Sequence, residues 1–298
     1  MTLRILQFGT TGQLATELLR QAPDHDLTLT ALSRADCDLA DPDAAGRAVA
    51  EARPDLVVIA AAYTAVDLAE SQRDLARTIN VEAPAAIAAA AAAIGAAVVN
   101  VSTDYVFAGD GEAPYAEDAA TNPLNVYGAT KLAGEQAVAV ANPRALNIRT
   151  SWVVSAHGKN FIKTMLRVAE NGNPLKVVDD QRGRPTSAAD LAGFILAQAP
   201  RLAAAKAGDP VFGVVHFANS GEVTWRGFAQ AIFAEALGDK APEVGSQTTA
   251  EFVTPARRPL HATMDLGKLQ RVFGVTPRPW PEALGEIIAE LKTLASAP

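Results

Sequence analysis

The sequence has few of the features that mark disulfide-bonded, membrane-spanning or nucleic-acid-binding proteins. Cys37 is its only cysteine, so no internal disulfide can form. The longest apolar stretch, residues 83–99, is mostly alanine, contains Pro84 and Gly95, and is shorter than the roughly 20 residues that span a bilayer. A net charge of -7 argues against a nucleic-acid partner.

The start of the sequence also lacks a targeting signal. Met1 leads directly into an apolar segment, without the charged region and cleavage site of a signal peptide. We therefore expect a cytoplasmic protein whose partners are neither membranes nor nucleic acids. The 298 residues, 49% of them hydrophobic, suffice for one large or two modest domains with a buried core.

Apolar runs typical of buried strands alternate with alanine-rich helical segments through the first half. Strands are expected over 3–8, 27–32, 56–60, 97–101 and 145–150, and helices over 14–21, 44–52, 75–94 and 126–141. This alternation predicts an α/β fold, a Rossmann-like doubly wound parallel sheet with helices on both faces. Ligands of such sheets bind at the carboxyl ends of the strands.

The second half has a looser pattern. Helices are expected near 161–171, 190–199, 225–237 and 281–295, and strands over 175–178 and 211–217. We interpret 1–155 as an NAD(P)-binding Rossmann-like domain that 186–220 rejoins. The segments 156–185 and 221–298 are then a smaller α/β substrate-binding domain, which acts as a lid.

A glycine turn separates the first expected strand from the first helix. Gly9, Thr11 and Gly12 belong to it, and Gln13 and Leu14 open the helix. Such a turn lets the backbone approach a pyrophosphate at the positive end of the helix. Ala15 replaces the third glycine of the dinucleotide motif, a mild change because that position serves packing. The alternative is a turn that only caps a helix.

The end of the second strand is where cofactor choice is usually decided. Arg34 stands there instead of an acidic residue, and an arginine can pair with a 2′-phosphate, which favours NADPH and leaves NADH possible. A solvated surface arginine is the alternative. Asp38 and Leu39 follow, where they can line an adenine pocket.

Small and polar residues end the next two strands. Ala61 and Ala62 leave room for a nucleotide, and Tyr63 and Thr64 add polar contacts, although tight strand packing also explains the alanines. The following strand ends at Ser102 and Thr103 in the same crevice, where Thr103 can hold a substrate carbonyl.

Tyr127 and Lys131 stand four residues apart on an expected helix. This spacing puts them on one face, where the ammonium can lower the phenol pKa from about 10. Alone, the pair equally describes a surface lysine beside a packed tyrosine. Its position after the Thr103 strand and the glycine turn favours a hydride-transfer site in which Tyr127 is the acid.

Together these motifs resemble the extended short-chain dehydrogenase/reductase superfamily, and within it the dTDP-4-dehydrorhamnose reductases. The resemblance covers nearly the full length. The matching segments are 9–14, 61–70, 102–107, 125–135, 149–153, 158–161, 177–181, Gly183, 185–186 and 258–259.

The resemblance implies NADPH-dependent reduction of the C4 ketone of dTDP-4-dehydro-L-rhamnose to dTDP-L-rhamnose, the last step of dTDP-L-rhamnose biosynthesis. Tyr127 would protonate the forming alkoxide, Lys131 would lower its pKa and bind the nicotinamide ribose, and Thr103 would orient the carbonyl. Asp104, Trp152 and Val66 would contact the sugar. The implied cofactor contacts are Gly12, Gln13, Leu14, Asp38, Leu39, Ala62, Tyr63, Thr64, Tyr127 and Lys131.

The sequence departs from the family pattern near its end, which reads Arg258-Pro259-Leu260-His261-Ala262 instead of Arg-Pro-x-Asn-Ser. The resemblance also implies a possible use of Mg²⁺, which some family members bind through glutamates at a dimer contact. Asp190 is a candidate for one such position, but a single carboxylate is too little for a hard cation, and a solvated helix acid is the preferred interpretation, so no metal is assigned.

Neighbouring activities fit less well. A 4,6-dehydratase is expected to have a glutamate at the position of Tyr105. An epimerase-reductase such as GDP-fucose synthase is expected to have a cysteine-histidine pair in the sugar pocket, whereas Cys37 falls in the expected cofactor loop. Another nucleotide-sugar ketoreductase stays open, as does a non-catalytic regulatory homologue, such as the beta subunit of methionine adenosyltransferase. The nucleotide base and a homodimer are also left open.

Overall fold

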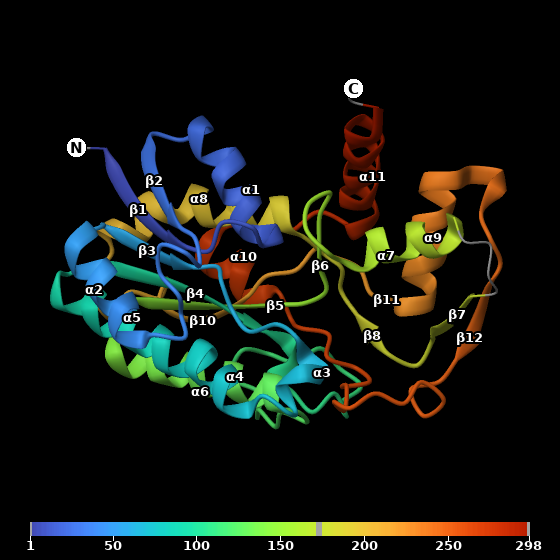
Figure 1. Ribbon diagram of the computed structural model, residues 1–298, viewed down its shortest axis with the longest axis horizontal. Coiled ribbons are helices and arrows are strands. Elements are labelled where there is room, and N and C mark those ends of the chain that lie inside the picture. Colours follow the sequence, from blue (N-terminus) through green and yellow to red (C-terminus); the bar gives the residue numbers. More distant parts are fainter. Residues whose placement is uncertain (1, 171–174, 297–298) are drawn as a thin grey trace.

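The computed structural model describes residues 2–170 and 175–296. Its centre is a parallel sheet of six strands, with β1 between β2 and β3 (Figure 1). Across the sheet the strands are β10 (Gly213–His216), β5 (Ala145–Thr150), β4 (Ala97–Thr103), β3 (Leu56–Ile59), β1 (Leu3–Phe8) and β2 (Leu27–Leu32). The predicted α/β class with a Rossmann-like sheet is confirmed, and the segment around 211–217 does rejoin the sheet, as its edge strand.

Helices cover both faces of this sheet (Figure 1). One face packs against α1 (Gln13–Gln21), α8 (Ala188–Ala204) and α10 (Gly267–Phe273). The other packs against α2 (Pro42–Ala52), α5 (Ala83–Ala93) and α6 (Val126–Ala141). With apolar helices on both sides, β3 and β5 are buried along their whole length, and all four residues of β3 are apolar.

A second core, formed by the second half of the chain, lies beside the sheet (Figure 1). It is formed by α7 (Phe161–Glu170), α9 (Trp225–Leu237) and α11 (Trp280–Ser296), with β7 (Leu175–Val178) paired to β12 (Val244–Gln247). Short elements connect the two cores: β6 (Val153–Val154), β8 (Arg182–Gly183), β9 (Thr186–Ser187) and β11 (Val223–Thr224). The exact division into two domains remains a prediction.

The helix expected over 75–94 is interrupted. It consists of α4 (Arg73–Arg77), a π-helical turn (Thr78–Glu82) and α5, and the short α3 (Val66–Ala69) precedes it. Buried Asn80, in the π-helical turn, accepts a hydrogen bond from the Tyr63 amide at 2.9 Å and donates one to the Tyr63 carbonyl at 3.2 Å. The widened turn therefore fixes the loop that follows β3, in keeping with the frequent occurrence of π-bulges near functional sites.

Two further boundaries differ from the sequence prediction. The short helix α10 lies between the helices expected near 225–237 and 281–295, where the sequence predicted none, and its Leu269 and Phe273 join the core of the sheet. Helix α2 starts at Pro42 because Asp41 caps it, accepting a hydrogen bond from the Ala44 amide at 2.9 Å. Asn171, the last residue of one expected helix, lies outside the described residues.

Within residues 2–170 and 175–296, no helix combines the length and the apolar character needed to cross a membrane.

Candidate active site

Two adjoining cavities open where the strands of the sheet end. The turn cavity, about 580 Å³, is lined by the glycine turn and by the loop after β2. The tyrosine cavity, about 490 Å³, is lined by the end of β4 and the start of α6. Both cavities share Thr11, Gly12, Ala60, Ala62 and Thr64. They are therefore two ends of one cleft at the carboxyl edge of the sheet.

The glycine turn has the backbone geometry of an anion site. Gly9 has a φ of +104°, which disfavours any residue with a Cβ, and a Cβ there would lie only 3.1 Å from the Cβ of Ala61. Within the described structure, no side chain caps α1, and its first turn contains no acidic residue. The free amide groups at this helix start can thus receive a phosphate.

The loop after β2 places Arg34, Asp38 and Leu39 on the lining of the turn cavity. Arg34 Nε donates to Asp38 Oδ2 at 3.1 Å, and their side chains are 80% and 40% exposed. Asp38 also accepts from the Ala40 amide, and this bond, more than Arg34, holds the pKa of its carboxyl below the usual range. Arg34 therefore lines the cavity predicted for the cofactor, but its side chain is exposed to solvent and its charge is partly neutralised by Asp38.

Two predicted cofactor contacts use their side chains elsewhere. The Gln13 amide group donates to the Val153 carbonyl at 2.9 Å and accepts from Asn160 at 3.0 Å, so it ties the turn to the loop after β5. The Tyr63 hydroxyl donates to Gln72 at 2.9 Å, and Tyr63 is not among the described residues that line either cavity. For Gln13, the backbone amide is what remains available to a phosphate.

The tyrosine cavity brings together the residues predicted to do chemistry. Thr103 ends β4, and α6 begins just before Tyr127 because Asn125 caps it, accepting from the Gly128 amide at 2.8 Å. Tyr127 and Lys131 then lie on one helix face and line the cavity with Thr103 and Asp104. Thr103 Oγ1 donates to Asp104 Oδ1 at 2.9 Å.

Burial dominates the electrostatics of this cavity. Tyr127 is partly accessible, yet the surrounding protein displaces enough water to raise its pKa to about 12, against a smaller opposing effect of the Thr103 hydrogen bond. Burial likewise lowers the pKa of Lys131 to about 8 and raises that of Asp104 to about 7. Burial thus outweighs the lowering of the tyrosine pKa that the sequence led us to expect. The phenol is therefore protonated at neutral pH, as it would be at its ordinary pKa, and the raised value makes its proton harder to give up.

A buried ion pair lies behind Lys131. Arg149 Nη2 lies 2.8 Å from Glu135 Oε2, their side chains are only 5% and 4% exposed, and the Arg149 guanidinium stacks over the Phe107 ring. The Glu135 carboxylate opposes the effect of burial on the pKa of Lys131. Sequence reasoning gave neither Glu135 nor Arg149 a role, although Glu135 follows Lys131 at helical spacing, a signal that was available.

The lining of the tyrosine cavity also includes Val66, Trp152 and Trp225, and sequence reasoning missed Trp225. Trp225 is the first residue of α9 and stacks on Trp152. The atypical segment near the end of the chain is firmly held: Arg258 Nη2 pairs with Asp67 at 2.9 Å, and His261 Nε2 lies 3.1 Å from Glu222.

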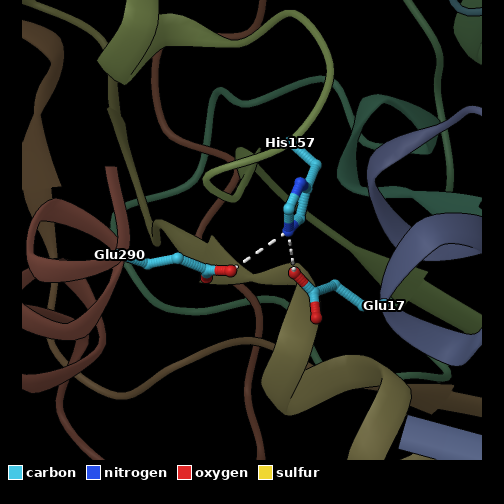
Figure 2. Close-up of side chains that lie close together, drawn as sticks. All are labelled: Glu17, His157 and Glu290. Atoms are coloured by element: carbon cyan, nitrogen blue, oxygen red, sulfur yellow. Dashed lines mark ion pairs between the residues drawn. The ribbon is translucent and has the colours of Figure 1, made fainter. Parts of the chain in front are cut away.

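Asp190, the acid considered as a metal ligand, is engaged elsewhere. It pairs with Arg278 at 2.8 Å and accepts from Asn219 at 2.6 Å. A different cluster draws two carboxylates together with a histidine: His157 Nε2 lies 3.7 Å from Glu17 and 3.2 Å from Glu290 (Figure 2).

This cluster already contains a cation. Arg20 Nη2 lies 2.7 Å from Glu290 and its Nη1 lies 3.1 Å from Glu17. A guanidinium stays charged, and an imidazole nitrogen is not the oxygen ligand that Mg²⁺ prefers. The residues of this cluster therefore do not fit a magnesium site, and Arg20 ties α1 to α11 in its place.

Comparison with known proteins agrees with this architecture. Residues 3–293 match the family described as RmlD substrate binding domain. The dTDP-4-dehydrorhamnose reductase of Salmonella typhimurium is 42% identical, over 98% of this chain and 99% of its own. A crystal structure of a dTDP-4-dehydrorhamnose reductase from Clostridium acetobutylicum superposes with a TM-score of 0.90 at 36% identity, covering 97% of this chain and 100% of that one.

A second similar structure is that of dTDP-4-dehydrorhamnose reductase from Bacillus anthracis in complex with NADP. It has a TM-score of 0.90 at 34% identity and covers 97% of this chain and 100% of its own. The family resemblance predicted from the motifs is thus confirmed over nearly the whole length. The chain belongs to the family described as RmlD substrate binding domain.

Proposed function

We propose that this protein reduces the C4 ketone of dTDP-4-dehydro-L-rhamnose to dTDP-L-rhamnose with NADPH, the last step of dTDP-L-rhamnose biosynthesis. The observation that carries the proposal is the joining of the two cavities. Thr103, Tyr127 and Lys131 line one end of a cleft whose other end is a glycine turn suited to a dinucleotide. The relatives that cover nearly the whole chain bear the name of this reductase.

The residues of the tyrosine cavity divide the work of the reduction. NADPH, when bound, supplies the hydride that adds to C4. The Tyr127 hydroxyl, which is protonated at neutral pH, gives its proton to the carbonyl oxygen as that oxygen becomes an alkoxide. Thr103 orients the carbonyl oxygen by hydrogen bonding, and Lys131 places a positive charge beside the developing negative one.

For the sugar, the proposed contacts are Asp104, Val66 and Trp152, which all line the tyrosine cavity. For the dinucleotide, they are the backbone at Gly9, Thr11, Gly12, Gln13 and Leu14, the alanines Ala61 and Ala62, Tyr63 and Thr64, and the loop with Arg34, Asp38 and Leu39. Arg34 supports NADPH over NADH because it lines the turn cavity with a guanidinium suited to a phosphate.

The test is the oxidation of NADPH by purified protein with dTDP-4-keto-6-deoxy-L-mannose, followed by the loss of NADPH absorbance. Parallel assays use NADH, the UDP- and GDP-linked keto sugars, and no sugar. Turnover with the dTDP-linked substrate, best with NADPH, is expected. If the pure protein binds NADPH but consumes it with none of these sugars, and instead captures a protein partner tightly, the chain is a regulatory homologue and the proposal is wrong.

The setting and assembly are proposed separately. We place the reaction in the cytoplasm, where a chain with one cysteine is suited to reducing conditions. The other proposed partner is a second copy of the chain. Light scattering after size exclusion distinguishes such a homodimer from a monomer at the mass of one 31.1 kDa chain.

A further inference from the structure

Trp152 has an unusual backbone for a bulky residue. Its φ is +44°, in the left-handed region, where a side chain with a Cβ is disfavoured. Such a conformation persists only when neighbouring residues hold it in place, and it occurs preferentially at functional sites. Because Trp152 lines the tyrosine cavity, the residues that hold its indole in place also shape the cavity wall.

The Trp152 indole is held from two sides. On one side it stacks on the Trp225 indole, with ring centroids 3.5 Å apart and planes at 11°. On the other side lies Gly183, where an added Cβ would come within 2.6 Å of the indole ring. Gly183 is thus a glycine because the ring occupies the space of its side chain.

Trp225 is itself anchored by the second core. It is the first residue of α9, which Thr224 caps by accepting from the Gly227 amide at 3.0 Å. The Thr224 hydroxyl in turn donates to Asp179 at 2.7 Å, and Asp179 also pairs with Arg226 at 3.2 Å. Phe161 packs against the Trp225 ring, with centroids 4.6 Å apart. Asp179, a motif residue with no role in the chemistry, therefore fixes the start of the helix that carries Trp225.

We propose that Trp225 is a positioning residue for the sugar nucleotide: by stacking on Trp152 it fixes the indole that forms the sugar-facing wall of the tyrosine cavity. The second core thereby sets the shape of a site whose acid, Tyr127, belongs to the sheet. This proposal rests on the proposed reductase function, since it assigns the wall to the sugar of that reaction.

The test compares Trp225→Leu and Trp225→Phe with the unaltered protein. Leucine removes the aromatic stack, so KM for the keto sugar nucleotide is expected to rise about tenfold, with KM for NADPH changed by less than about twofold. Phenylalanine keeps a stacking ring and should restore KM to within about threefold. Binding of dTDP-L-rhamnose, measured by calorimetry, should weaken in parallel, which gives a reading independent of turnover.

Circular dichroism reports the stack directly. Two parallel indoles at this distance couple their electronic transitions, and this exciton signal should disappear in Trp225→Leu and persist in a control, Trp280→Phe, which alters the tryptophan packed on Phe228 away from the cavity. Gly183→Ala moves the Trp152 ring from its other side and should raise KM for the sugar nucleotide without altering Trp225, in case Trp225→Leu folds poorly.

The outcomes separate the two proposals. If Trp225→Leu loses the exciton signal but keeps unaltered KM and product affinity, Trp225 only packs the boundary between the cores, and the inference is wrong. An equal rise of the KM values for NADPH and sugar also contradicts it, because the effect is then general. If the unaltered protein turns over no keto sugar, the proposed function fails, and binding of dTDP-L-rhamnose still decides whether Trp225 positions a sugar nucleotide.

Discussion

The two ends of the cleft differ in how they are exposed to water. In the tyrosine cavity, Thr103, Asp104 and Lys131 are at most 5% exposed. In the turn cavity, the charged residues that could select a cofactor, Arg34 and Asp38, have side chains 80% and 40% exposed. The cleft at the carboxyl edge of the sheet thus has one end whose charged residues are buried and another whose charged residues are exposed to solvent.

This difference shows that the buried end depends on the electrostatics of its side chains, whereas the open end depends on backbone geometry. At the buried end, loss of water shifts the pKa values of Asp104 and Lys131 towards neutrality. At the open end, salt and water screen each charge, so Arg34 contributes little. There the backbone geometry of Gly9 and the start of α1 matter more. Substitutions should therefore have large effects at the buried end and small ones at the open end.

Tyr127→Phe should have the largest effect. It removes the only proton that we assign to the forming alkoxide, so kcat should fall roughly a hundred- to ten-thousand-fold. NADPH binding, measured by fluorescence titration, should stay close to normal because the ring remains. A matched control is Tyr115→Phe, whose hydroxyl binds Asp110 outside both cavity linings. Turnover of Tyr127→Phe close to that of the control would refute the assigned acid.

Asp104→Asn should have the next largest effect, on stability. Between its ordinary pKa of 3.8 and about 7, the folded protein holds a proton on Asp104 that the unfolded chain has lost. The Asp104 contribution to the free energy of unfolding therefore falls as pH rises through this window. Asparagine does not titrate, so its contribution does not fall with pH. Relative to the unaltered protein, the free energy of unfolding of the variant should therefore rise by roughly 2–4 kcal/mol between a pH below this window and a pH above it.

Urea denaturation on either side of that window measures the difference. Asp118→Asn is the control, because Asp118 is exposed and its replacement removes the same charge from the surface. A pH-independent difference between Asp104→Asn and the unaltered protein would mean that Asp104 is as well solvated as the control.

The local sequence pattern was enough to predict most of the sheet and the residues at its carboxyl edge. The apolar run of β3 was recognisable because both faces of this sheet are covered, and the glycine turn marked the cofactor end because Gly9 has a positive φ and lies close to Ala61. The cluster of Thr103, Tyr127 and Lys131 was predictable because parallel strands end at one edge.

What depends on long-range packing could not be predicted in this way. The sign of the Tyr127 pKa shift depends on how much water the folded protein excludes, which a spacing of four residues does not reveal. Trp225 joins the cavity only through the fold of the second core, with 72 residues between it and Trp152 in the chain. Helix α10 is seven residues long and is stabilised by Leu269 and Phe273 against the sheet, so its own sequence gave a weak signal.

Loss of the Lys131 charge should have an intermediate effect. Burial lowers its pKa to about 8, so the ammonium is present below that pH and is lost as pH rises through it. We expect kcat/KM to be level at lower pH and to fall about tenfold per pH unit well above 8. Lys131→Arg keeps its charge, so its profile should show no such fall, even with lower activity. A profile that falls identically in both proteins would assign the titration to another group.

Arg34→Ala should have the smallest effect, at the open end of the cleft. Because this side chain is 80% exposed, its pairing with a 2′-phosphate is worth little, and KM for NADPH should rise only about threefold while KM for NADH stays unchanged. The difference should shrink further at high salt. Arg47→Ala, which removes an exposed arginine paired with Asp41 outside the cavity lining, is the matched control. A rise of more than about a hundredfold in KM for NADPH would contradict the contrast between the two ends of the cleft. Arg34 would then select the cofactor as strongly as the buried residues control the chemistry.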